Sequence, residues 1–296
     1  MDQGAAYQSF HQKLRRRRKW GTVFAVTCGM LSLVGLVALG LLIARVLDEG
    51  WAWLTWRFVT NYPSQLWPEE SGIRSALFGS LWLVAITALV SVPIGIGAAI
   101  YLEEYAPHNR LTRLIHLNIA NLAGVPSIVY GILGLAVFVR YARLDRSVIA
   151  GGLTLSLLIL PVIIIASREA IVAVPSSFRQ AAFALGATRW QTVWAHVLPN
   201  ALPGIMTGII LAVSRALGEA APLIVIGATT YIAFTPDGLK SMFTALPIQI
   251  FMWSEQPQIE FQYLAAAGIL VLLGVLLPLN LIAVMVRAWH QKRKVW

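Results

Sequence analysis

The sequence contains little charge and almost no cysteine. Only 12% of its 296 residues are Asp, Glu, Lys or Arg, whereas 58% are hydrophobic, and the mean hydropathy is +0.71. Soluble globular domains have about 25% charged residues. The composition therefore excludes an ordinary soluble domain and indicates an all-α integral membrane protein. With a single cysteine, Cys28, the chain cannot form an intrachain disulfide.

Motifs for ATP hydrolysis and for hydrolytic chemistry are also missing. The sequence has no G-x-x-x-x-G-K-[ST] phosphate loop, and none of its five lysines follows a glycine. It contains no H-E-x-x-H, C-x-x-C or G-x-S-x-G segment. The five histidines are scattered along the chain, which predicts no metal site. We therefore expect a protein that is not an enzyme and that holds no cofactor of its own.

Long uncharged windows predict six transmembrane helices. About 20 helical residues cross a hydrocarbon layer of ~30 Å, and each window reaches that length. The twelve-residue run 242–253 is too short to cross, so we expect a re-entrant or interfacial element that Pro247 interrupts. The six predicted spans are residues 20–44, 75–102, 114–139, 147–167, about 200–228, and 261–286.

Basic residues gather at both ends of the chain and predict its orientation. Six Lys and Arg lie between residues 13 and 19, and four more follow residue 286. The positive-inside rule then places both termini in the cytoplasm. This explains the net charge of +10 without a nucleic-acid partner. This orientation places one basic cluster, Arg140, Arg143 and Arg146, on the outer side of the membrane. The cluster is either a tolerated solvated loop or a basic outer vestibule.

These spans define the expected domain organisation. Residues 1–19 form a cytoplasmic basic tail, and residues 20–47 form an anchor helix in the lipid. A transmembrane domain covers residues 72–287, with a five-helix core and a long cytoplasmic loop at 175–199. A second basic tail occupies residues 288–296.

The loop 175–199 is too polar to span and too apolar to be disordered, which predicts two short helices. Ser177 with Gln180, and Thr188 with Gln191, have the spacing of capping boxes. Gly186 stands where a helix C-cap glycine belongs. An apolar face at i, i+3, i+4 and i+7 either packs on the bundle or docks a soluble partner. Its members are Phe178, Ala181, Ala182 and Leu185.

This loop resembles the EAA loop of ABC importer permeases. The order is Gln180-Ala181-Ala182, three residues, Gly186, nine residues, then an H-V-L-P segment. Gln replaces the usual Glu, and His196 replaces the usual Ile. The resemblance implies that the loop couples the bundle to an ATPase subunit. The coupling residues that it implies are Gln180, Ala181, Ala182, Gly186, Leu198 and Pro199.

The resemblance extends from about residue 74 to residue 287. Segments 125–139, 204–228 and 246–251 are similar to the PstA-type permeases of phosphate importers. The R-A-L-G-E core within 204–228 also resembles sulfate and molybdate permeases. The fold that this implies is the type I ABC importer (MetI-like) bundle, located in a bacterial inner membrane.

The same resemblance implies separate partners and alternating access. We expect a homologous permease subunit (PstC-like), two ATP-binding cassette subunits (PstB-like), a periplasmic phosphate-binding protein (PstS-like) and surrounding membrane lipid. ATP and Mg²⁺ would bind to the partner subunits. The alternatives are a permease for another oxyanion such as sulfate or molybdate, and a stand-alone secondary transporter in which Glu219 relays protons.

The apolar run 210–228 carries two opposite charges, Arg215 and Glu219. A charge at mid-bilayer costs about 2.5–3.5 kcal/mol on insertion scales. The two residues, at i and i+4, can neutralise each other, but an apolar pair would often be as stable. We therefore predict that they line the solute pathway, with Arg215 as anion donor and Glu219 as acceptor from a protonated solute such as phosphate. Ser214 and Thr207 line the same route or bond a neighbouring helix.

Overall fold

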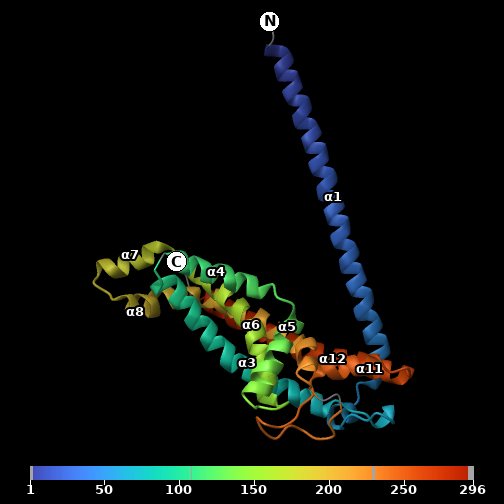
Figure 1. The fold of residues 1–296 in the computed structure, drawn as a ribbon. Coiled ribbons are helices and arrows are strands. Elements are labelled where there is room, and N and C mark those ends of the chain that lie inside the picture. Colours follow the sequence, from blue (N-terminus) through green and yellow to red (C-terminus); the bar gives the residue numbers. More distant parts are fainter. Residues whose placement is uncertain (1–2, 108, 229–230, 293–296) are drawn as a thin grey trace.

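The computed structural model describes residues 3–107, 109–228 and 231–292. All regular elements in these residues are helices, and five are long and apolar enough to cross a membrane (Figure 1). The expected all-α membrane architecture is confirmed. Residues 1–2 and 293–296 of the two predicted tails lie outside the described residues. The five long helices are α1 (Gln3–Gly50), α3 (Arg74–Ile100), α6 (Val148–Val172), α9 (Leu198–Gly218) and α12 (Ile259–Lys292).

Helix α6 is the centre of the bundle and packs against both α3 and α9. About 67% of its apolar window is buried, against 28% for α3 and 33% for α9. Small residues permit the close approach of α9. A Cβ added at Gly204 would lie 2.7 Å from the Cβ of Ala170, and Gly208 faces Ala166 even more closely. The G-x-x-x-G spacing thus serves helix packing, as such steps do in membranes.

Helix α1 projects away from the bundle and meets it near its own C-terminal end (Figure 1). There Gly50 lies against α12, where an added Cβ would be 2.7 Å from the backbone of Ala266 and Ala267. None of the apolar window of α1 is buried by the described residues. Its flank is therefore available to lipid or to a second protein.

The predicted third span, residues 114–139, is not one straight helix. It is divided into α4 (Arg110–Ala123) and α5 (Ser127–Gly134), and α5 continues into the π-helical segment η4 (Leu135–Tyr141). The two parts meet at an angle of 101°. The predicted third span is therefore a bent pair of helices, and the structure has the six predicted spans if this pair is one span.

Proline chemistry accounts for this bend. Pro126 cannot donate a hydrogen bond to the carbonyl of Leu122, four residues earlier, and it disfavours the helical conformation of the preceding residue. The Leu122 carbonyl oxygen instead accepts from the Val125 amide at 3.0 Å and from the Tyr130 hydroxyl at 2.8 Å. The freed carbonyl is therefore satisfied within the bend.

The short run at 242–253 contains helix α11 (Leu246–Ser254), which packs against α3 and α12. Pro247 does not interrupt this helix. It lies in the first turn, where the missing N–H costs nothing. The Leu246 amide donates to Ser80 Oγ at 2.8 Å, which ties the start of α11 to α3. The remaining short elements outside the loop and pathway are η1 (Trp51–Trp53), α2 (Trp56–Thr60) and η2 (Pro68–Glu70).

Candidate solute pathway and coupling site

The charged pair lies at a break in the chain. Helix α9 ends at Gly218, Glu219 is extended with φ −84° and ψ 114°, and the five-residue α10 (Ala221–Val225) begins after it. The predicted span over about 200–228 is therefore confirmed as far as Gly218, and its continuation as one helix to residue 228 is wrong. Pro222 explains the break, because it cannot donate to the carbonyl of Gly218 and its ring would clash there.

This break lies level with the middle of the bundle. The contacts of Gly204 with Ala170 and of Gly208 with Ala166 make α9 antiparallel to α6. Continuing that register places Arg215 level with Ile159, near the centre of the 25-residue α6. Non-helical backbone at membrane depth is tolerated where protein covers it or where it lines a polar cavity. The break thus coincides with the predicted solute pathway, which stays a prediction.

Arg215 keeps most of its hydrogen-bonding capacity. Its Nε donates to Glu219 Oε1 at 3.2 Å, and the two side chains are 45% and 19% exposed. Among the described residues the guanidinium has no other hydrogen-bond partner. Its position in the last turn of α9 also complements the negative end of the helix dipole. The two terminal amino groups of Arg215 can therefore bind anion oxygens in a fork.

The hydroxyls of Ser214 and Thr207 both donate hydrogen bonds to helix residues. The Ser214 hydroxyl donates to Asn280 Oδ1 of α12 at 2.6 Å. The Thr207 hydroxyl donates to the Pro203 carbonyl oxygen at 2.8 Å. These contacts favour the packing alternative, and a place in the pathway stays a prediction. The sequence analysis did not identify Asn280, although an amide inside an apolar run was a signal for it.

The basic loop with Arg140, Arg143 and Arg146 lies against the segment that follows α10. Arg143 and Asp145 have left-handed φ angles of 51° and 54°, which are strained for residues with a Cβ. Gly227 has a φ of +83°, and a Cβ added to it would lie 2.7 Å from Arg146 Nε. The structure thus brings Arg146 beside the end of the predicted pathway segment.

At the other end of the bundle, the loop after α6 forms helices α7 (Ser176–Ala184) and α8 (Arg189–Thr192), and the π-helical turn η5 (Val193–Val197) leads into α9 (Figure 1). Gly186 ends α7 with a φ of +81°. The Ala187 amide donates to the Ala182 carbonyl, and the Gly186 amide to that of Phe183, both at 3.0 Å. This pair of bonds is a Schellman motif, so the predicted cap is confirmed.

The two predicted capping boxes have different outcomes. Thr188 and Gln191 form the reciprocal box that their spacing predicts. The box of Ser177 and Gln180 is absent, because α7 begins at Ser176 after Pro175. Ser177 therefore lies inside the first turn and cannot cap it.

The predicted apolar face of α7 is divided between the interior and the surface. Ala182 is buried, whereas Ala181 and Gln180 are exposed. Leu198 is partly buried at the start of α9, and Pro199 is exposed. Large apolar side chains form an exposed surface that we name the α7–α8 surface. Its members are Phe178, Phe183, Leu185, which is 90% exposed, Trp190 and Trp194.

Arg179 attaches α7 to the bundle, and the sequence analysis did not identify it. Its Nε and Nη2 donate to Glu104 Oε1 at 3.0 and 2.6 Å. Its Nη1 donates to the Val174 carbonyl at 2.8 Å, and Nη2 donates to the Ile171 carbonyl at 3.0 Å. Glu104 belongs to the π-helical turn η3 (Tyr101–Tyr105), which continues α3. One side chain thus joins α7 to the ends of α3 and α6.

The chain is similar to transport permeases over most of its length. Residues 91–295 match the family described as "Binding-protein-dependent transport system inner membrane component". The "Phosphate transport system permease protein PstA 1" of Mycobacterium tuberculosis is 32% identical over 290 residues, which cover 95% of this chain and 92% of that protein. The "Probable ABC transporter permease protein YqgI" of Bacillus subtilis is 33% identical over 205 residues, which cover 68% of this chain and 69% of that protein.

A solved structure has the same fold. The inward-facing MetNI methionine ABC transporter matches with a TM-score of 0.59 at 17% sequence identity. The match covers 74% of this chain and 95% of the matching chain. At this identity the likeness concerns the arrangement of the helices alone.

Proposed function

Because the chain belongs to the family of binding-protein-dependent transport system inner membrane components, we propose that it is the permease of an ATP-driven importer of inorganic phosphate. As a multi-pass permease it is not the ATPase, which is a separate subunit in ABC transporters. The phosphate assignment is supported by relatives named as phosphate permeases in Mycobacterium tuberculosis and Pasteurella multocida. The observation that carries it is the underused guanidinium of Arg215 at the mid-depth break.

In this proposal the charged pair handles the solute. Arg215 donates to phosphate oxygens through its two free amino groups, which stay charged at every physiological pH. Phosphate near neutral pH retains at least one proton, so Glu219 accepts a hydrogen bond from it. Sulfate has no proton to donate and meets only the repulsion of the carboxylate. The pair therefore favours phosphate over sulfate along the path.

The energy for transport arrives at the C-terminal end of α6, where the loop with α7 and α8 begins. We infer that the ATPase subunit docks on the α7–α8 surface, where Leu185, Trp190 and Trp194 are exposed. ATP and Mg²⁺ bind in that subunit. A push on α7 passes through Arg179 to the ends of α3 and α6. Alternating access then follows from two packings of the same helices, with ATP supplying the energy difference.

The proposed assembly contains the partners that this mechanism needs. A phosphate-binding protein delivers the solute on the outer side, and two ATPase subunits work on the cytoplasmic side. A homologous permease subunit completes the path, and the unburied flank of α1 offers it a surface. Both termini lie in the cytoplasm and the membrane is the bacterial inner membrane, as the basic tails favour.

The test is phosphate uptake into proteoliposomes that hold the whole complex. Uptake should require ATP, the ATPase subunits and the binding protein together, and phosphate should be preferred to sulfate and molybdate. Accumulation by this chain alone, without nucleotide, would instead identify a secondary transporter. A preference for sulfate or molybdate in the complete system would identify a permease for another oxyanion.

A further inference from the structure

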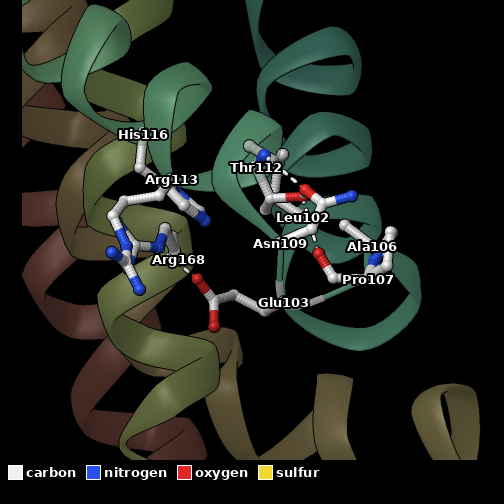
Figure 2. Close-up of a pocket in the computed structure, with 9 residues that line it drawn as sticks. All are labelled: Leu102, Glu103, Ala106, Pro107, Asn109, Thr112, Arg113, His116 and Arg168. Carbon is white, nitrogen blue, oxygen red and sulfur yellow. Dashed lines mark hydrogen bonds and ion pairs between the residues drawn. The ribbon is translucent and has the colours of Figure 1, made fainter.

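A polar cavity of about 250 Å³ lies between α4, η3 and α6, away from the solute pathway. Figure 2 shows its lining side chains, which come from these three elements and from the loop between η3 and α4. The volume corresponds to roughly eight waters at ~30 Å³ each, which is ample for a phosphate group. The charged and titratable members are Glu103, Arg113, His116 and Arg168.

The cavity contains more unused donors than acceptors. Arg168 donates to Glu103 Oε1 through Nε, and both of its terminal amino groups lack a partner among the described residues. Arg113 forms no ion pair or side-chain hydrogen bond with any residue that the structure describes. His116 Nδ1 is buried in the wall without a hydrogen-bond partner. Two guanidinium groups against one carboxylate leave the cavity net positive and suited to an anion.

The outer face of α4 places this cavity at a membrane surface. Leu111, Leu114 and Leu117 are 64%, 55% and 58% exposed, whereas Arg113 and His116 line the cavity. A helix with one exposed apolar face and one charged face lies in the headgroup region of a bilayer. The cavity is also at the same end of the bundle as α7, because Glu103 lines it and the neighbouring Glu104 holds Arg179 of α7. We assign this side to the cytoplasm.

We propose that this cavity binds a phosphate group, which Arg113 and the free amino groups of Arg168 hold by charge-assisted hydrogen bonds. The imidazole of His116 lines the same cavity beside them. The phosphate group belongs either to the headgroup of an anionic phospholipid or to inorganic phosphate on the cytoplasmic side. Arg215 takes no part, so the site exists whether or not the proposed solute is correct.

Glu103 competes with the bound group for Arg168. It precedes Glu104, the carboxylate that holds Arg179 of α7, and Arg189 Nη1 of α8 donates to the Glu104 carbonyl oxygen at 3.4 Å. A phosphate group on Arg168 therefore acts on the same π-helical turn that anchors the coupling loop. Occupancy of the cavity is positioned to adjust how firmly α7 is held.

The experiment uses the membrane complex with its ATPase subunits but without the phosphate-binding protein, and compares the native chain with Arg113→Gln and with the control Arg110→Gln. Arg110 begins the same helix but does not line the cavity. In one arm, native mass spectrometry follows retained dioleoyl phosphatidylglycerol in delipidated complex. In the other arm, equilibrium binding of labelled inorganic phosphate is measured in an Arg215→Gln background, which removes the pathway residue from the signal.

We expect Arg113→Gln to lower binding at least tenfold in one arm, while Arg110→Gln leaves both arms unchanged. The arm that responds identifies the source of the phosphate group. Glu103→Gln, which removes the competing carboxylate, should raise binding severalfold in that arm. The proposal is overturned if neither probe binds, if Arg113→Gln binds as well as the native chain, or if Glu103→Gln weakens binding.

Discussion

Two Arg–Glu pairs in this molecule differ in almost every physical respect. Arg179 and Glu104 are 75 residues apart, only 21% and 11% exposed, and in contact at 2.6 Å. Arg215 and Glu219 are four residues apart, 45% and 19% exposed, and in contact at 3.2 Å. The first guanidinium uses all three nitrogens on protein partners. The second uses one.

The difference indicates what each pair does. A guanidinium that is saturated by a carboxylate and two carbonyls holds helices together, and it has nothing left to offer a solute. A guanidinium with a single contact at 3.2 Å keeps its two terminal amino groups free for a solute and does less to hold helices together. Four substitutions break or sharpen this comparison.

Arg215→Gln should have the largest effect on transport. Losing two charge-assisted hydrogen bonds of ~1.5 kcal/mol each corresponds to about a hundredfold loss of phosphate uptake. Thermal stability should fall less than in Arg179→Gln, because Arg215 makes one protein contact, at 3.2 Å. ATP-dependent uptake and thermal unfolding of the purified complex measure the two effects. Arg215→Lys keeps the charge without the forked geometry, so its uptake should lie between those of the native chain and Arg215→Gln. If both variants take up phosphate within twofold of the native rate, the pair is structural.

Arg179→Gln should have the opposite profile. It leaves Glu104 nearly buried without its partner, which costs about 3 kcal/mol, and α7 loses its link to α3 and α6. Uptake should fall about tenfold through weaker coupling, with a lower unfolding temperature. A double variant with Glu104→Gln should recover part of the stability, since no charge remains unpaired. Unchanged stability in the single variant would show that the link is not needed.

Glu219→Gln should change selectivity more than rate. The neutral amide removes repulsion toward sulfate and weakens acceptance of the phosphate proton, so the ratio of phosphate to sulfate uptake should fall about fivefold, or ~1 kcal/mol. Competition between labelled phosphate and unlabelled sulfate measures this ratio. An equal loss for both solutes would contradict the role of Glu219 in discrimination.

Gly186→Ala should have the smallest effect. A Cβ at a φ of +81° costs about 1 kcal/mol, and nothing lies within 4 Å to obstruct it. A drop of a few degrees in the unfolding temperature is expected, with uptake within threefold of native. Gly97→Ala in α3, which also has open space but no positive φ, is the matched control and should not destabilise. Equal responses at the two positions would mean that the left-handed turn after α7 is unimportant.

Several features were predictable because they depend on neighbours in the chain. Apolar windows are read from composition and length, so the membrane architecture followed. The turn at Gly186 and the box of Thr188 with Gln191 followed from side chains and backbone groups within a few residues. The prolines at 126 and 222 also carried the signal for broken helices. The uninterrupted apolar windows around them obscured that signal.

What the sequence by itself determined is therefore the lipid-embedded, all-helical nature of the protein, its turns and the presence of charge in an apolar run. Only the tertiary structure decided that Ala182 faces inward, that Arg179 meets Glu104, and that α4 and α6 enclose a basic cavity. The physical reason is the distance along the chain over which each interaction acts. Hydrophobicity and capping act within one or two helical turns, whereas the pairing of side chains 75 residues apart depends on how whole helices pack.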